Sequence, residues 1–311
     1  MVSLKKLDKR DNYIILADNF YNEKNKEKAL KFYLKAMEFD VNEEKSIELL
    51  FKISLLYDEL GYKKEAINSY EKIIELDKKQ AGAYYGIAII LDDLNEKEKA
   101  LKYYYKTLDI DCEYDRAYFY IANIYDEKGD KQRAIKNYKK VIELTPNDYM
   151  AHNNLGAIYE EIGEYHKAYK MIEKSIELNP TYYKALFNMG VIEKHLGNFK
   201  NAIKYYDKSI RENNKYPYTY LNKSVIYIED KLLYDAIKIL TEGIKNNPNA
   251  GFLYYNRGCC YAKLNNEKKA INDLEEAIKI YPKFVDIIKK DKDLKKLLNN
   301  NKLNQILKYS K

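Results

Sequence analysis

The sequence DRAYFYIANIYDEKGDKQRAIKNYKKVIELTPND (residues 115–148) is followed without a gap by YMAHNNLGAIYEEIGEYHKAYKMIEKSIELNPTY (residues 149–182). Aligned end to end, the two stretches share a small residue at position 8, Gly at position 15, Ala at position 20 and Pro at position 32. These residues are Ala122 and Gly156, Gly129 and Gly163, Ala134 and Ala168, and Pro146 and Pro180. Self-similarity at a fixed period of about 20 to 50 residues predicts a repeat architecture.

The alanine at position 20 marks further copies on both sides. It recurs with one spacing of 37 residues and then six of 34, at Ala29, Ala66, Ala100, Ala134, Ala168, Ala202, Ala236 and Ala270. After a lead-in of residues 1–9, this frame predicts eight repeats over residues 10–43, 47–80, 81–114, 115–148, 149–182, 183–216, 217–250 and 251–284. The repeat replaces the two-domain expectation that a length of 311 residues would otherwise suggest.

Within each copy, the residue sizes predict two packed antiparallel helices. Positions 4, 8 and 11 lie on one helical face, and positions 20, 24 and 27 lie on another. Small residues at positions 8 and 20 let the helices approach closely, and mostly large residues at positions 4, 11 and 24 fill the remaining space. Gly or Asn stands at position 15 in six copies and tolerates the left-handed backbone that ends a helix.

This 34-residue pattern resembles the tetratricopeptide repeat (TPR) family. The resemblance covers residues 10–284, although Tyr replaces the Trp that is frequent at position 4 in the family. It implies an all-α fold, a right-handed superhelical α-solenoid of helix-turn-helix repeats, with a concave groove lined by the first helix of each repeat.

Two features depart from the regular frame. Three extra residues, Glu44–Ser46, separate the first two repeats, and Asn42 before two glutamates is typical of a helix N-cap with an acidic first turn. We therefore expect the first helix of the second repeat to begin about one turn early. Position 7 is apolar elsewhere but is Lys223 and Arg257 in the last two repeats, where the stems of these side chains can still cover apolar surface.

The basic character of the chain is concentrated at its C-terminus. Of the net charge of +7, residues 283–311 contribute +6 through nine Lys and three Asp. Apolar residues at helical spacing predict one helix from Phe284 to Leu298 and a second, short helix around Leu303. We interpret residues 285–311 as basic helices that cap the solenoid. The alternative is an adaptor helix that binds an anionic partner, either nucleic acid or a membrane surface.

The sequence carries no catalytic or metal-binding signature. It has no phosphate-binding loop, no G-x-G-x-x-G, no H-E-x-x-H and no C-x-x-C, so we predict no enzymatic activity, metal site or cofactor. The three cysteines, Cys112, Cys259 and Cys260, do not form a disulfide framework and fit a reducing compartment. The charged N-terminus lacks the apolar stretch of a secretory signal, and no apolar run reaches about 18 residues, so we expect a cytoplasmic protein without a transmembrane segment.

In the TPR family, positions 2, 5, 6, 9, 12 and 13 face the concave surface. Position 6 is asparagine in the last four repeats, at Asn154, Asn188, Asn222 and Asn256. An amide can both donate to and accept from a peptide backbone, and the arrangement is similar to the asparagine ladders of O-GlcNAc transferases and peptide-pheromone receptors. We predict that the ladder grips an extended chain. Candidate side-chain pockets lie at position 5, at Phe187, Leu221 and Tyr255.

The two-carboxylate clamp of heat-shock chaperone-binding TPR proteins is matched only in part. Three of its five positions correspond to Asn123, Asn154 and Lys184. Phe119 and Asn188 stand where the clamp needs Lys and Arg, so the resemblance implies a damaged clamp.

Positions 12 and 13 carry pairs of acidic residues in the second to fifth repeats. These are Asp58 and Glu59, Asp92 and Asp93, Asp126 and Glu127, and Glu160 and Glu161. They occupy the last turn of each first helix, where the helix dipole disfavours anions, so helix stability does not explain them. They form either an acidic rim that attracts a basic ligand or ion pairs with lysines of adjacent repeats.

Together these patterns favour a non-catalytic scaffold that binds an extended peptide or protein segment of unknown identity in its concave groove. The residues before 283 hold 46 basic and 45 acidic side chains, and this near-neutrality argues against a nucleic-acid partner. Self-association through the ends of the solenoid is a further interpretation that the sequence leaves open.

Overall fold

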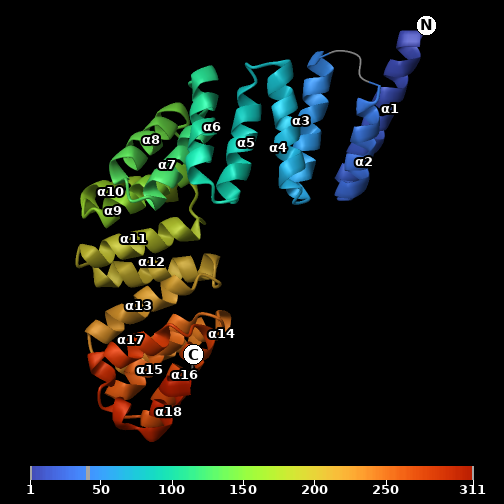
Figure 1. The fold of residues 1–311 in the computed structure, drawn as a ribbon. Coiled ribbons are helices and arrows are strands. Elements are labelled where there is room, and N and C mark those ends of the chain that lie inside the picture. The colour runs from blue at the N-terminus through green and yellow to red at the C-terminus, as the bar shows by residue number, and fades with distance from the viewer. Residues whose placement is uncertain (1, 40–42, 310–311) are drawn as a thin grey trace. The chain divides into compact units, whose positions relative to one another are not determined.

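The computed structural model describes residues 2–39 and 43–309, and within these ranges it contains eighteen α-helices, two 3₁₀ helices and no strand (Figure 1). The first eight helices are α1 (Val2–Asn22), α2 (Lys26–Met37), α3 (Glu43–Glu59), α4 (Lys63–Leu76), α5 (Ala81–Asp93), α6 (Lys97–Ile110), α7 (Asp115–Glu127) and α8 (Lys131–Leu144). The next eight are α9 (Tyr149–Glu161), α10 (Tyr165–Leu178), α11 (Tyr183–His195), α12 (Phe199–Glu212), α13 (Pro217–Glu229), α14 (Leu233–Asn246), α15 (Gly251–Lys263) and α16 (Glu267–Ile280). The last elements are α17 (Phe284–Lys290), η1 (Lys292–Leu294), η2 (Leu297–Asn299) and α18 (Asn301–Tyr309).

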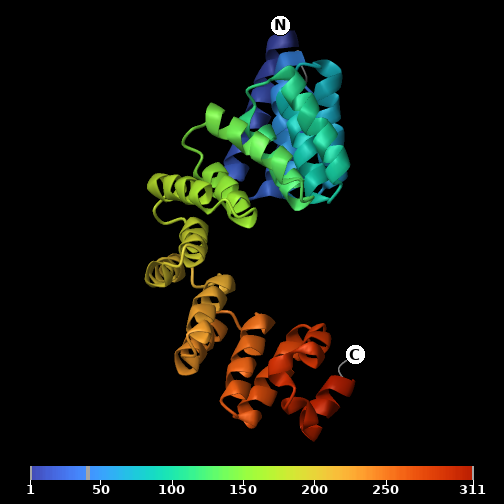
Figure 2. The same ribbon diagram turned by 90° about the vertical axis from the view of Figure 1, so that its left-hand side faces the viewer.

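The chain divides into two compact units, Met1–Pro146 and Asn147–Lys311, which we name the N-terminal and C-terminal units. In the N-terminal unit, α1 to α8 form four packed helix pairs that stack in chain order. In the C-terminal unit, α9 to α16 form four further pairs, and α17 and α18 pack against α16. Figures 1 and 2 show these pairs within each unit. The predicted all-α solenoid of helix-turn-helix units is confirmed.

The two helices of each pair touch where their side chains are smallest. The alanine at position 20 is fully buried in all eight pairs, and the large residue at position 24 is buried beside it. At Gly190 on α11, an added Cβ would lie only 2.5 Å from Cε1 of Tyr206 on α12, whose side chain has no exposed surface. Because interiors are close-packed, this contact sets how near α11 and α12 can lie.

The substitution Gly190→Ala should therefore destabilise the protein. Overpacking a core costs about 1–3 kcal/mol, which exceeds the gain of about 1 kcal/mol from replacing Gly with Ala in a helix. Gly82→Ala is the matched control, because its new Cβ would meet Phe51 at an ordinary 3.4 Å. Urea unfolding should show a loss of about 1 kcal/mol for Gly190→Ala and no loss for Gly82→Ala. Equal stabilities would contradict the close-contact account.

The turn inside each pair uses a left-handed residue at position 15. Positive φ angles occur at Lys24, Gly61, Asn95, Gly129, Gly163, Gly197, Lys231 and Asn265. The six Gly and Asn positions were predicted from the sequence, and the structure adds Lys24 and Lys231 at φ 61°. A non-glycine residue held in this region costs about 1–3 kcal/mol, so the packing of the two helices fixes the turn even where the sequence opposes it.

The extra residues between the first two repeats lengthen a helix. Helix α3 begins at Glu43, four residues before residue 47, where the regular frame of the second repeat begins, so the predicted early start is confirmed. The expected N-cap, Asn42, lies outside the described residues. The unusual cations at position 7 are both paired, Lys223 with Asp207 at 2.6 Å and Arg257 with the buried Asp273 at 2.7 Å.

The prediction of a single helix from Phe284 to Leu298 is wrong. Helix α17 ends at Lys290, and Asp291 adopts an extended backbone followed by the two 3₁₀ turns. The Asp291 carboxylate accepts hydrogen bonds from the backbone N–H of Asp293 at 2.8 Å and from the hydroxyl of Tyr255. These bonds hold Asp291 in a non-helical conformation. The spacing of apolar residues does not report such side-chain hydrogen bonds, so it could not predict where the helix ends.

The residues after Pro282 cover the end of the last helix pair. Their apolar side chains join those of α16 in one buried cluster that includes Phe284, Ile288, Leu294, Leu297, Leu303 and Leu307. Without this layer, α16 would expose an apolar face to water. The apolar face of the C-terminal segment is therefore used for packing inside the chain.

Candidate functional site: the concave helix faces

A mostly apolar hollow lies between α1 and α3 on the first helices of the N-terminal unit. It is lined by Asp18, Tyr21, Tyr33, Lys52, Leu55 and Leu56. Leu55 occupies position 9, on the surface that the family places inside the groove, and is 55% exposed. The sequence did not predict this hollow, because an apolar residue on a helix is usually assigned to the core. The position of Leu55 in the repeat, position 9, could have indicated that it faces the groove.

The polar edge of this hollow is already paired. Asp18 accepts hydrogen bonds from the Tyr33 hydroxyl and from Lys52 Nζ, the latter at 3.0 Å. Burial alone would raise the pKa of Asp18, but these two hydrogen bonds outweigh it and hold the pKa below its usual value. The open part of the hollow is consequently its apolar wall, which suits an apolar side chain of a ligand.

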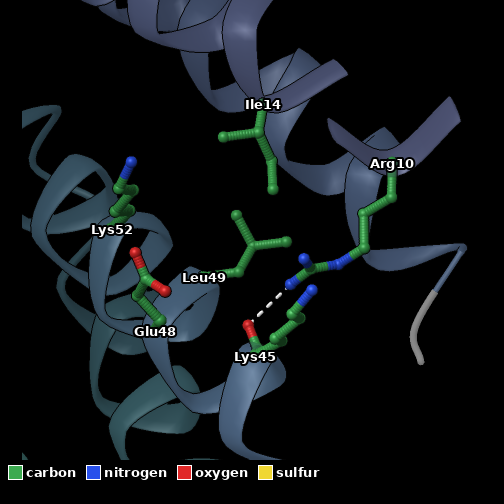
Figure 3. A pocket seen from close by; sticks show the side chains of 6 residues that line it. All are labelled: Arg10, Ile14, Lys45, Glu48, Leu49 and Lys52. Carbon is green, nitrogen blue, oxygen red and sulfur yellow. Dashed lines mark hydrogen bonds between the residues drawn. The ribbon is translucent and has the colours of Figure 1, made fainter. Parts of the chain in front are cut away.

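A second hollow shares Lys52 with the first (Figure 3). It is lined by Arg10, Ile14, Lys45, Glu48, Leu49 and Lys52. Arg10 is only 4% exposed, and its Nη2 donates to the backbone oxygen of Lys45 at 2.6 Å. The cavity of about 30 Å³ has room for one or two water molecules. This feature is therefore a joint between α1 and α3 and is too small for a peptide side chain.

In the C-terminal unit, the predicted ladder asparagines lie half-buried on α9, α11, α13 and α15. Asn222 and Asn256 each donate from Nδ2 to the carbonyl four residues earlier, at 3.0 Å to Tyr218 and 2.7 Å to Phe252. Each bond uses one N–H and fixes the plane of the amide. The Oδ1 atoms of both side chains accept no hydrogen bond from the described part of the chain.

The first two ladder residues are connected through a residue that the sequence did not single out. Asn188 Nδ2 donates to Asn153 Oδ1 at 2.9 Å, and Asn153 Nδ2 donates to Asn154 Oδ1 at 3.1 Å. Asn153 is buried and stands at position 5, where the later repeats have large apolar residues. The asparagine at this otherwise apolar position could have indicated a buried hydrogen bond.

The three position-5 residues pack into the protein. Phe187 contacts the rings of Tyr206 and Tyr216, and Leu221 packs on the cluster around Leu240. Tyr255 stacks on Phe284 and donates to Asp291. Each is half-buried, so the pockets predicted there are partly filled by the chain itself.

On the first helices of the C-terminal unit, an exposed aromatic surface lies instead at position 2. Tyr218 is 49% exposed and stacks on Phe252 with ring centroids 5.1 Å apart. Lys184 occupies the same position one repeat earlier and is exposed. Asn123, the remaining residue matched to the clamp, belongs to the N-terminal unit, where it accepts a hydrogen bond from the Tyr138 hydroxyl. That the clamp is damaged stays a prediction.

The acidic residues at positions 12 and 13 form a series of ion pairs between repeats. Lys97 at position 17 shows the geometry, since its Nζ lies 2.6 Å from Asp92 of the same repeat and 3.0 Å from Glu127 of the next. Pairs of the same kind are Lys26–Glu59, Lys63–Asp58, Lys63–Asp93 and Lys131–Asp126. These contacts support the ion-pairing interpretation of the acidic residues more than an open acidic rim.

In the C-terminal unit, the ion pairs at positions 12 and 13 involve different residue types. His195 Nε2 lies 3.0 Å from Glu160 Oε1, and the His195 ring stacks on Tyr165 at 4.7 Å. Burial raises the pKa of Glu160, and the nearby His195 offsets only part of this effect. Glu161 is exposed. Position 12 of the next repeat is basic, and Lys194 pairs with Glu229 at 2.9 Å.

Removal of a bridging lysine should weaken the coupling between repeats. Lys97→Met should lower the free energy of unfolding by about 1 kcal/mol, because it leaves two carboxylates next to each other without their cation. Lys99→Met is the control, since Lys99 is 66% exposed and its one ion pair among the described residues is with Glu96 on its own turn. Urea titrations at 0.05 M and 1 M NaCl measure both effects, and the difference should shrink at high salt. If Lys97→Met lowers the free energy of unfolding no more than Lys99→Met does, the proposed coupling between repeats is contradicted.

The described His, Cys, Asp and Glu side chains bear on metal binding and on thiol chemistry. Across residues 2–39 and 43–309, no three or more His, Cys, Asp or Glu side chains are grouped as metal ligands. Burial raises the pKa of Cys259 to about 12 and that of Cys260 to about 11, so both thiols are protonated and weakly nucleophilic at neutral pH. Over the same residues, no helix has the length and apolar character needed to cross a membrane.

Comparison with protein families agrees with this architecture. Tetratricopeptide repeat models match residues 47–80, 81–111, 149–182, 171–204 and 252–284, and a TPR repeat model matches residues 122–163. The stacked helix pairs define an α-solenoid repeat protein, and these matches together cover more than half of the chain. The chain belongs to the tetratricopeptide repeat family, whose members are typically non-catalytic and bind protein or peptide partners. No curated protein sequence matches it.

Solved structures with a similar fold include several repeat proteins. A tetratricopeptide repeat protein from Parabacteroides merdae is 17% identical, with a TM-score of 0.63 over 86% of this chain and 99% of that one. The APC/C hetero-tetramer Cut9–Hcn1 has a chain that is 18% identical, with a TM-score of 0.60 over 94% of this chain and 54% of that one. MamA 41-end from Desulfovibrio magneticus RS-1 is 19% identical, with a TM-score of 0.50 over 55% and 97%. At these identities the likeness concerns the fold alone.

Proposed function

We propose that the chain is a scaffold that holds an extended segment of a partner protein against the concave faces of its first helices. The observation that carries this proposal is the pair of pre-oriented amides, Asn222 and Asn256. Each is fixed by a bond to its own helix and presents an acceptor oxygen. Fixing a side chain before binding reduces the entropy that association costs.

The energetics call for apolar contacts in addition to the amides. A net hydrogen bond contributes about 1 kcal/mol, so four ladder bonds would give only about millimolar affinity. In the C-terminal unit, the exposed stack of Tyr218 and Phe252 supplies an apolar platform. In the N-terminal unit, the hollow beside Leu55 does the same. A ligand therefore combines backbone amide groups with apolar side chains.

The alternative of an anionic partner bound through the basic C-terminal residues has less support. Most apolar side chains of α17 and α18 are buried in the capping cluster, and the 43%-exposed Ile287 alone does not make an apolar face for a membrane. Several of the charges are also paired, as in Lys263–Asp293 and Lys302–Glu275. Free cysteines support a reducing compartment such as the cytoplasm.

The amide contribution can be tested with peptides selected from a random linear display library on the immobilised full chain. Asn222→Ala combined with Asn256→Ala should weaken their binding by about 30-fold, the equivalent of two hydrogen bonds of about 1 kcal/mol each. Asn188 is left intact because it satisfies the buried Asn153. Fluorescence anisotropy measures affinity, and circular dichroism checks folding.

The matched control is Asn68→Ala with Asn201→Ala, which removes two exposed amides from the second helices α4 and α12. It should leave peptide affinity unchanged. The groove proposal fails if the two double variants bind the selected peptides equally well.

A further inference from the structure

Helix α8 is the most basic helix in the described part of the chain. Its fourteen residues hold Lys131, Arg133, Lys136, Lys139, Lys140 and a single acid, Glu143, for a net charge of +4. The 282 residues before the C-terminal segment have a net charge of only +1. This concentration of charge is a property of one second helix, away from the concave positions discussed above.

The basic face of α8 borders an open hollow with α6. Its lining consists of Tyr105, Leu108, Asp109, Tyr118, Arg133, Lys136, Asn137, Lys139, Lys140 and Glu143. Its volume of about 720 Å³ falls in the range of about 300–1,000 Å³ that ligand sites occupy. Tyr105 is 42% exposed and Leu108 is half-buried, so the floor is partly apolar.

One end of the hollow is held by a rigid network. The hydroxyls of Tyr105 and Tyr125 lie 3.0 Å apart, and Arg133 Nη1 donates to the Tyr125 hydroxyl at 3.2 Å. The Arg133 guanidinium also lies 4.2 Å from the centroid of the Tyr125 ring and pairs with Asp130. The charge of Arg133 is therefore already compensated, and this network forms a wall.

The lysines are compensated to different degrees. Lys140 pairs with Glu143 at 2.6 Å on its own helix. Lys136 and Lys139 are exposed, and within residues 2–39 and 43–309 neither has an ion pair or a hydrogen bond from its side chain. Two uncompensated cations thus stand three residues apart, on one face of α8 beside a partly apolar floor.

We propose that this hollow is a second docking surface, which takes an extended acidic segment of a partner protein. Residues three apart on a helix have Cβ atoms about 5–6 Å apart. Alternate side chains of an extended peptide lie about 6.6 Å apart on one side. Carboxylates at alternate positions can therefore reach Lys136 and Lys139 together.

The charges in the hollow also discriminate between anionic partners. Asp109 and Glu143 line the same surface as the lysines. A polynucleotide carries a charge on every nucleotide and would bring phosphates close to Asp109, which has no ion pair among the described residues, and this approach is repulsive. A peptide can place carboxylates opposite the lysines and a neutral side chain opposite Asp109. An acidic protein segment is therefore the occupant that this arrangement favours.

The test uses the full chain and a fluorescein-labelled decapeptide in which Glu alternates with Ser. Lys136→Glu combined with Lys139→Glu should weaken binding by about tenfold or more, since it removes two attractions and adds two repulsions. Lys200→Glu with Lys204→Glu makes the same change of charge on α12 and should have little effect. Binding should also weaken as NaCl is raised from 0.05 M to 0.3 M.

Three outcomes would overturn the proposal. The decapeptide could fail to bind, or both double variants could lose binding equally, which would indicate attraction to net charge alone. A single-stranded DNA 20-mer could bind more tightly than the decapeptide and lose binding in the α8 variant, which would assign the hollow to nucleic acid. The Asn222→Ala, Asn256→Ala variant should bind the decapeptide normally, so failure of the groove proposal is separable.

Discussion

The architecture depends on the close approach of two helices across small residues. The alanine at position 20 is fully buried in all eight pairs, and the large residue at position 24 fills the space beside it. At Gly190 even one added methyl group would overlap Tyr206. Because the buried alanine and its large neighbour recur in every pair, each pair packs as a unit. The packing of the pair also holds Lys24 and Lys231 in the left-handed conformation, which costs less free energy for glycine than for lysine.

The proposed site follows from that constraint, since the packed pairs present the same positions of their first helices. Pre-oriented amides on α13 and α15, the Tyr218–Phe252 stack and the hollow beside Leu55 occupy such positions. Ion pairs between positions 12, 13 and 17 connect neighbouring repeats and engage most of the acidic side chains that the sequence places there. Amide and apolar groups of the first helices are the proposed contacts for a ligand, while the uncompensated Lys136 and Lys139 lie on α8.

The repeat made the fold predictable, because eight in-frame copies report the same packing. The groove residues were harder to interpret. The sequence located Asn188 but could not show that Asn153 accepts its amide proton, since that bond joins residues 35 apart. It presented Tyr255 as a pocket residue, whereas Asp291 occupies its hydroxyl. The helix predicted from Phe284 to Leu298 was too long for the same reason, because hydrogen bonds to Asp291 end α17 at Lys290. Periodicity reports which face is apolar, but side-chain hydrogen bonds between distant residues decide what remains open.

The central claim is that an extended ligand lies along the first helices. The most direct measurement is photo-crosslinking of a library-selected peptide to chains that carry benzoylphenylalanine in place of a single tyrosine. Tyr218 on α13 and Tyr234 on α14 are both exposed, at 49% and 77%. Tyr218 stands at position 2, which the family places on the concave surface, whereas Tyr234 lies on a second helix. The account predicts a strong crosslink at 218 and little at 234. A crosslink at 234 with none at 218 would contradict it.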